Sequence, residues 1–227
     1  MNKMLTVSNQ LEIKNEAVEP DGLEMLADSV RGEIIRVEEE YAGVRIKLMA
    51  MLGKARIPLQ VDVGFGDAVT PAPQEMHFPT LLDFPSPTLR AYRPETVIAE
   101  KFQAMVDLGL RNTRLKDFYD IWKLAQQFEF EGEILAEAIR ATFARRQTAL
   151  PNDVPLALSN QFAEDSLKVS QWAGFLRKSA LRDAGTPLTE VINLLNDFLL
   201  PPMQATREGE RFARQWTKAG AWEAKAD

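Results

Sequence analysis

Residues 92–120 hold the most informative pattern of this chain and read YRPETVIAEKFQAMVDLGLRNTRLKDFYD. The first half predicts a helix from Pro94 to about Gly109, because proline suits the first helical position and glycine is a common terminator. Apolar residues recur between them at three- and four-residue spacing, which is typical of one buried helix face. Lys101 lies inside that apolar stripe, where lysine is uncommon. Either its ammonium group reaches water at the edge of the core, or it has an anionic partner.

The second half predicts another amphipathic helix, which begins near Asn112 or Thr113 because either residue can cap it. Its apolar stripe consists of Phe118, Ile121, Trp122, Ala125 and Phe128. Asp117 and Asp120 are three residues apart and therefore share one face beside that stripe. An early acid complements the helix dipole, which accounts for Asp117 but not for Asp120. For either acid the alternative is an ion pair with Lys116, Arg114 or Lys123.

Residues 44–63 predict a β-hairpin, because apolar and polar residues alternate on both sides of a turn at Gly53 and Lys54. Period two places Asp62 on the face opposite Val61 and Val63, at the end of a strand. Aspartate is disfavoured in strands. Asp62 is therefore either a solvent-facing strand residue or an acid with a function.

The rest of the chain divides into extended and helical segments. Residues 70–94 contain six prolines, which exclude a long helix and predict an extended connection with at most one short strand. Three further amphipathic helices are predicted, over residues 131–146, 166–179 and 188–200, and Pro201-Pro202 is expected to end the last one. The segment after residue 202 is charged, and three aromatic residues are interspersed in it. The pattern leaves open whether it is helical, frayed or bound to a partner.

Composition bounds the function. The chain has 227 residues, 45% of them hydrophobic, with no cysteine, one histidine and a formal net charge of −6. Disulfides and a histidine-rich zinc site are excluded. The N-terminus has no apolar run suited to export and no eighteen apolar residues are consecutive, so we expect a cytoplasmic protein that does not enter the membrane. The acidic balance opposes nucleic-acid binding through the global field, but local arginine clusters leave room for a basic groove.

Several ordered segments carry a resemblance to a known family. They are residues 93–125, residues 45–71 (RIKLMAMLGKARIPLQVDVGFGDAVTP), residues 78–92 (FPTLLDFPSPTLRAY) and residues 138–148 (AIRATFARRQT). In this order they resemble the AbiEii-type nucleotidyltransferase toxin family of the polymerase-beta-like superfamily, which acts in type IV toxin–antitoxin and abortive infection systems. The similarity extends from about Gly22 to Leu200.

The resemblance implies a fold and an activity. The expected fold is α+β, with a partial nucleotidyltransferase-type mixed sheet in residues 1–90, a helical domain in residues 91–202 and a charged tail in residues 203–227. The implied reaction transfers a nucleotide from a nucleoside triphosphate (NTP) to an RNA acceptor such as the 3′ end of a tRNA, with Mg²⁺ as cofactor.

The resemblance also implies roles for individual residues. Lys101 and Arg114 would contact the nucleotide phosphates. Asp117 would orient Lys101 or the nucleotide, with Asp120 as the second choice for that role. Asp62 would assist the metal or activate the acceptor hydroxyl.

One departure from the family pattern opens alternatives. The chain contains neither the Gly-Ser pair nor the Asp-x-Asp of the family's first motif, and so it looks N-terminally truncated relative to the family. It is then either inactive as written, a scaffold that binds nucleotide or a cognate antitoxin, or completed by upstream sequence or a neighbouring chain. Loss of the first strand would expose a sheet edge, which we expect the N-terminal residues, the tail or another subunit of a homo-oligomer to cover.

Overall fold

The computed structural model describes residues 21–35, 43–65, 69–179, 185–218 and 220–224. The chain forms two compact units, Met1–Asp67 and Ala68–Asp227. The first contains a sheet, and the second contains all of the described helices together with two small sheets. The α+β class and the helical C-terminal part are confirmed. The boundary between the units lies between residues 67 and 68, whereas the expected boundary was at residue 90.

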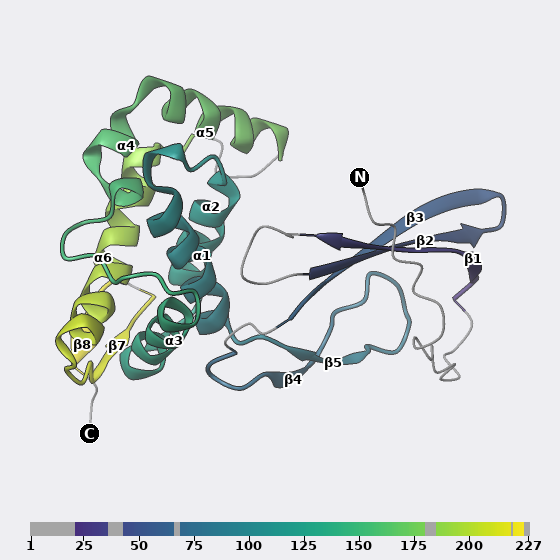
Figure 1. The fold of residues 1–227 in the computed structure, drawn as a ribbon, viewed down its shortest axis with the longest axis horizontal. Coiled ribbons are helices and arrows are strands. Elements are labelled where there is room, and N and C mark those ends of the chain that lie inside the picture. The colour runs from purple at the N-terminus through teal and green to yellow at the C-terminus, as the bar shows by residue number, and fades with distance from the viewer. Residues whose placement is uncertain (1–20, 36–42, 66–68, 180–184, 219, 225–227) are drawn as a thin grey trace. The chain divides into compact units, whose positions relative to one another are not determined.

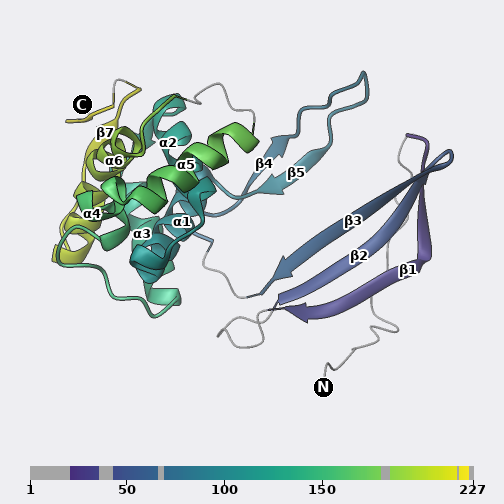
Figure 2. The ribbon, with the colours of Figure 1, turned by 90° about the horizontal axis from the view of Figure 1, so that it is seen from above.

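The first unit, called the sheet unit below, is a three-stranded sheet in the order β1-β2-β3, with β2 in the middle (Figure 2). Its strands are β1 (Leu23–Ile35), β2 (Gly43–Leu52) and β3 (Ala55–Gly64). The predicted hairpin is confirmed, and Gly53 has the positive φ of 58° that its two-residue turn requires. All strand pairs among the described residues are antiparallel, so the mixed sheet is wrong for this part of the chain. The physical reason is the short connection, because a two-residue turn reverses the chain and a parallel pair needs a long crossover.

Strand β1 was not predicted from the sequence. Its register against β2 shifts between Leu26 and Arg31, so the alternation of apolar and polar residues is interrupted in the middle of the strand. At this irregularity the Ser29 hydroxyl accepts a hydrogen bond from the Met49 amide at 2.8 Å. A side chain thus replaces a missing ladder bond, and no period-two pattern signals that arrangement.

The sheet unit buries little apolar surface among its described residues. Ala50 is its only fully buried apolar side chain there, whereas large apolar residues stay exposed: Leu23, Met25, Ile34, Leu52, Val61 and Phe65. The prediction that other residues or another subunit cover such a surface stays a prediction. Residues 1–20, which were one candidate for the cover, lie outside the described ranges.

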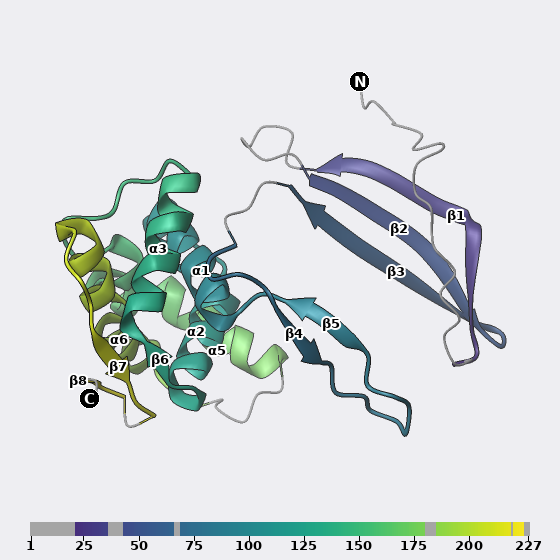
Figure 3. The same cartoon turned by 90° about the horizontal axis from the view of Figure 1, so that it is seen from below.

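The second unit, called the helical unit below, begins with an antiparallel hairpin that extends away from its helices (Figure 3). Strands β4 (Gln74–His77) and β5 (Thr88–Ala91) form it. The proline-rich segment therefore contains two strands rather than at most one. Pro79, Pro85 and Pro87 all lie in the connection between the strands, where they cost no ladder hydrogen bond.

The helices of this unit pack around one core (Figure 1). They are α1 (Pro94–Leu108), α2 (Leu115–Gln127), α3 (Gly132–Arg145), α4 (Asn160–Glu164), α5 (Ser166–Lys178) and α6 (Leu188–Glu208), with 3₁₀ turns η1 (Gly109–Arg111) and η2 (Leu156–Leu158). Both ends of α1 are confirmed. Phe128 was wrongly placed in the apolar stripe of α2, because it follows the last turn and is exposed.

Helix α6 corrects the predicted stop at Pro201-Pro202, since it continues through both prolines to Glu208. Pro202 has no amide to donate to the carbonyl of Phe198. The indole Nε1 of Trp222 donates to that carbonyl instead, at 3.1 Å. A tertiary contact thus satisfies the acceptor that the proline leaves open.

The predicted tail is part of the helical unit. It contains the last turns of α6 and two strands, β7 (Arg214–Trp216) and β8 (Trp222–Ala224). With β6 (Phe130–Glu131) they form an antiparallel sheet in the order β6-β7-β8, and Trp216 is completely buried. Across the ranges that the structure describes, no helix is long and apolar enough to span a membrane.

Candidate functional site

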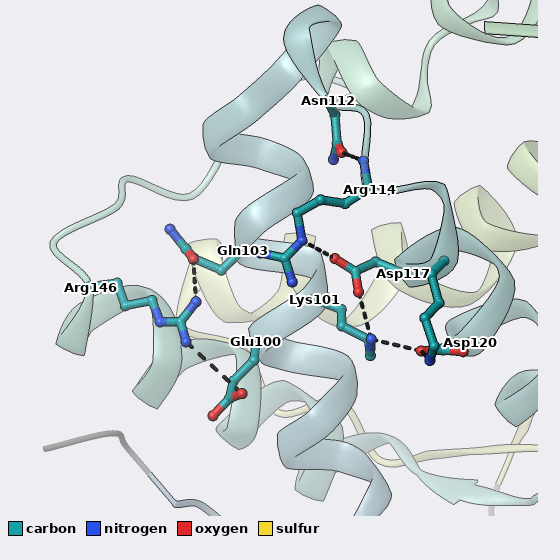
Figure 4. A network of polar contacts seen from close by, with 9 residues as sticks. Glu100, Lys101, Gln103, Asn112, Arg114, Asp117, Asp120 and Arg146 are labelled. Atoms are coloured by element: carbon teal, nitrogen blue, oxygen red, sulfur yellow. Dashed lines mark hydrogen bonds and ion pairs between the residues drawn. The ribbon is translucent and has the colours of Figure 1, made fainter. Parts of the chain in front are cut away.

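The site begins with Lys101, whose side chain leaves the buried face of α1 and is 17% exposed. Its Nζ lies 2.6 Å from Oδ1 of Asp117 and 2.8 Å from Oδ2 of Asp120, both on α2 (Figure 4). The two acids share a helix face because they are three residues apart. Of the two interpretations of Lys101, the structure supports the one with anionic partners.

Two further cations extend this pair of contacts into a row. Arg114 Nε lies 2.7 Å from Oδ2 of Asp117, and Lys116 Nζ lies 2.6 Å from Oδ2 of Asp120. The two acids thus form ion pairs with Arg114 and Lys116, which the sequence offered as the alternative to a functional role. Lys123 Nζ instead lies 4.7 Å from the ring centroid of Trp122. We call the sequence Arg114–Asp117–Lys101–Asp120–Lys116 the charge row.

The charge row is buried in the middle and open at its ends. Asp117 is 5% exposed, whereas the side chains of Arg114 and Lys116 are more than half exposed. Three cations alternate with two carboxylates, so the row carries one surplus positive charge. A row with surplus positive charge, whose outer cations face solvent, attracts an anion rather than a metal ion.

Electrostatics keep Lys101 protonated. Burial of the ammonium group lowers the pKa of Lys101, but hydrogen bonding and charge interactions with Asp117 and Asp120 raise it by more. The net pKa therefore lies above the ordinary lysine value. Lys101 is a fixed cation at neutral pH, not a general base.

A second polar cluster lies on the opposite side of α1 and binds it to the residues that follow α3. Arg146 Nη1 donates to Oε1 of Gln103 at 2.9 Å, and Arg146 Nη2 lies 4.0 Å from Oε2 of Glu100 (Figure 4). The amide of Gln103 donates in turn to the Thr148 hydroxyl at 2.8 Å. These contacts link α1 to the end of α3, so the helix that carries Lys101 is held from both sides.

Asp62 lies on β3 in the sheet unit and is not part of the charge row. Arg45 holds both of its carboxylate oxygens, through Nε to Oδ1 and through Nη2 to Oδ2, each at 2.8 Å. The Gln60 amide lies 3.2 Å from Oδ1. Asp62 is therefore a strand residue that forms a bidentate ion pair with Arg45 on an exposed face.

The residues that the structure describes do not fit the Mg²⁺ site that the resemblance implies. No three of their histidine, aspartate or glutamate side chains come close enough together to hold a metal ion. The carboxylates of Asp62, Asp117 and Asp120 each face cations already. Magnesium binds through carboxylate oxygens that are free to coordinate. The metal role of Asp62 stays a prediction.

Comparison with known proteins identifies the family of the chain. A family model described as the nucleotidyl transferase AbiEii toxin of type IV toxin–antitoxin systems matches residues 10–190. The chain belongs to this family. No curated protein and no solved structure matches the chain. The matched AbiEii region includes Lys101, Asp117 and Asp120 as well as Asp62.

Two contacts of this AbiEii protein escaped sequence reasoning. Arg45 was available as a partner for Asp62, because a hairpin that turns at Gly53 and Lys54 pairs residue 45 with residue 62. The turn position alone could have shown it. The hydrogen bond from the amide of Arg114 to the side chain of Asn112, at 2.7 Å, was missed because the sequence predicts Asn112 or Thr113 as a helix cap. It forms a turn instead, and α2 begins after it, at Leu115.

Proposed function

We propose that this protein transfers a nucleotide from a nucleoside triphosphate to an RNA acceptor, and that the acceptor class is tRNA. The observation that carries the proposal is the charge row, in which Lys101 is held protonated at the rim of α1. Membership of the AbiEii nucleotidyl transferase family supports the reaction class. Both substrates occur in the cytoplasm, where the sequence predicts the protein to be.

In this proposal the charge row binds the triphosphate. Lys101 supplies a point charge to phosphate oxygens, and Arg114 adds a planar donor group suited to two of them. Asp117 and Asp120 do not contact the phosphates, because their role is to hold Lys101 in place. Positioning of this kind lowers the barrier by fixing the reacting phosphate before the reaction.

The test is transfer of label from an NTP that carries radioactive α-phosphate to total tRNA. Lys101→Met should reduce labelling by about a hundredfold, the usual cost of removing one preorganised charge from a reacting group. Lys178→Met is the matched control, because Lys178 is an exposed lysine on α5. Labelling by Lys101→Met at the wild-type rate would remove Lys101 from the mechanism. The same assay with added Mg²⁺ and with a chelator tests the metal dependence that the resemblance implies.

The second candidate function is a non-catalytic scaffold that binds nucleotide or a cognate antitoxin. It is favoured by one observation, namely that the chain contains no Gly-Ser pair and no Asp-x-Asp. Equilibrium binding of a non-hydrolysable NTP analogue separates the two functions. Binding that depends on Lys101, without any labelling of RNA in the presence of Mg²⁺, would favour the scaffold. Co-purification with a cognate antitoxin would test the protein partner.

A further inference from the structure

Lys168 is a buried lysine outside the charge row. It lies in the first turn of α5 and is 7% exposed. Its Nζ donates to the backbone carbonyl of Asn112 at 2.7 Å and lies 5.0 Å from the ring centroid of Phe162. Within the described part of the chain, its ammonium group has no carboxylate partner.

This placement carries an energetic cost. A cation in the first turn of a helix opposes the helix dipole, and an ammonium group is rarely buried without an acid. A charged hydrogen bond to a carbonyl is stronger than a neutral one and offsets part of the cost. The hydrogen bond to the carbonyl of Asn112 therefore explains a lysine at this position.

Asn112 forms the turn that precedes α2. The residue is fully buried, and its backbone amide donates to the carbonyl of Gly109 at 3.1 Å. Its side-chain Oδ1 accepts the amide hydrogen of Arg114 at 2.7 Å. The carbonyl of Arg114 then accepts the amide hydrogen of Asp117 at 2.9 Å. Fixing the carbonyl of Asn112 thus fixes the backbone that presents two members of the charge row.

A second path from Lys168 leads to the same place. The Phe162 ring beneath its ammonium group stacks on Phe118, with centroids 5.2 Å apart and planes within 10°. Phe118 follows Asp117 directly in α2 and is completely buried. One lysine therefore supports α2 through the turn before Asp117 and through the ring after it.

We propose that Lys168 is a positioning residue that holds Arg114 and Asp117 in register with Lys101. It acts through the Asn112 turn and does not touch substrate. Its effect on nucleotide binding rests on the function proposed above. Its effect on the backbone of residues 112–117 does not, and the two are measured separately.

The first measurement is amide hydrogen exchange of the full chain. Lys168→Met keeps the apolar stem but removes the ammonium group, and it should reduce protection of the Arg114 and Asp117 amides at least tenfold while the α3 amides keep theirs. Ile192→Val, a change in the buried core of α6, is the comparison for a general loss of stability, which would lower protection throughout the helical unit. Unchanged protection at residues 114 and 117, or a uniform loss as in Ile192→Val, would overturn the proposal.

The second measurement is the dissociation constant of a non-hydrolysable NTP analogue. Lys168→Met and Arg114→Gln should each weaken binding about tenfold, and the double variant should lose less than the sum of the two binding free energies, because the two residues share one chain of contacts. Additive losses would overturn the proposed route through Arg114. Wild-type protein that fails to bind nucleotide would refute the proposed function, and the exchange result would still decide the role of Lys168.

A variant that does not fold has a substitute. Lys168→Gln keeps a neutral donor that ends one bond closer to the backbone, and it should show the same local loss of protection. Lys168→Arg, which retains a cation of greater reach, should restore protection at residues 114 and 117 at least in part. Protection that is equally poor in Lys168→Arg and Lys168→Met would count against a role for the charge.

Discussion

The sheet unit and the helical unit each contain a short contact between a cation and an aspartate, in very different surroundings. Arg45 and Asp62 lie 2.8 Å apart on an open strand face, and Lys101 and Asp117 lie 2.6 Å apart at the rim of a core. Asp62 is 42% exposed, whereas Asp117 is almost completely buried. Distance alone therefore does not rank the two contacts. Access of water does, because exposed ion pairs contribute little and buried charges depend on their partners.

The same contrast applies to packing. The described part of the sheet unit has almost no buried apolar residue, while the helical unit has one continuous core. All four tryptophans, Trp122, Trp172, Trp216 and Trp222, belong to the helical unit. Tryptophan fluorescence therefore follows unfolding of the helical unit alone, separately from that of the sheet unit.

The largest effect is expected from Asp117→Asn. The change leaves Lys101 with one carboxylate and removes the anion from beside Arg114. We expect the free energy of unfolding of the helical unit to fall by about 2 kcal/mol, less than the 3–5 kcal/mol for a fully buried pair because water reaches Lys101. Urea unfolding followed by tryptophan fluorescence measures it.

Asp120→Asn is the matched comparison on the same helix. Asp120 is more exposed than Asp117, so its loss should destabilise the helical unit less. Equal losses for the two variants would show that burial does not rank these contacts, and the contrast between the units would lose its basis.

A smaller loss is expected from Lys101→Met. Each acid keeps another cation, since Arg114 stays beside Asp117 and Lys116 beside Asp120. The methionine side chain also retains the packing of the lysine stem. We expect the free energy of unfolding to fall by about 1 kcal/mol, measured in the same urea experiment. A loss larger than that of Asp117→Asn would contradict the idea that the acids share their cations.

The pH dependence sharpens the comparison further. Because the folded protein raises the pKa of Lys101, its contribution to stability is complete below the ordinary lysine value of about 10.4 and is lost as pH rises through the folded pKa. The stability difference between wild type and Lys101→Met should therefore shrink at alkaline pH. Arg45, whose pKa is also raised, stays charged throughout this range. A difference that stays constant up to pH 11.5 would refute the linkage.

The smallest effect is expected from Asp62→Asn. The Arg45–Asp62 pair is exposed, so its loss should not measurably change the hydrogen exchange of the β2 and β3 amides, either at low salt or in 1 M NaCl. Asp117→Asn, followed at the α2 amides, serves as the positive control. Loss of protection along β2 and β3 in Asp62→Asn would show that the exposed pair does hold the sheet together.

Local signals account for what the sequence predicted well. Pro94 and Gly109 bound α1 because each acts on its own backbone, and the spacing of Asp117 and Asp120 places them on one face regardless of their neighbours. The alternation on both sides of Gly53 predicted the β2–β3 hairpin for the same reason. These features depend on a few consecutive residues.

Features that depend on distant residues were missed or wrong. In α6, Trp222 donates to the carbonyl that Pro202 leaves open, and the start of α2 depends on a side chain that forms a turn where a cap was expected. The support of the Asn112 turn by Lys168 joins residues that are far apart in the sequence. No local pattern carries this information, because each contact is decided by packing of the whole unit.

The indole of Trp222 has a practical consequence for handling this protein. The indole supplies the hydrogen bond that Pro202 cannot. A shortened version that stops after α6 would therefore leave the carbonyl of Phe198, in the middle of α6, without this donor. Recombinant versions should therefore retain the chain through residue 224, and affinity tags placed at that end need a spacer.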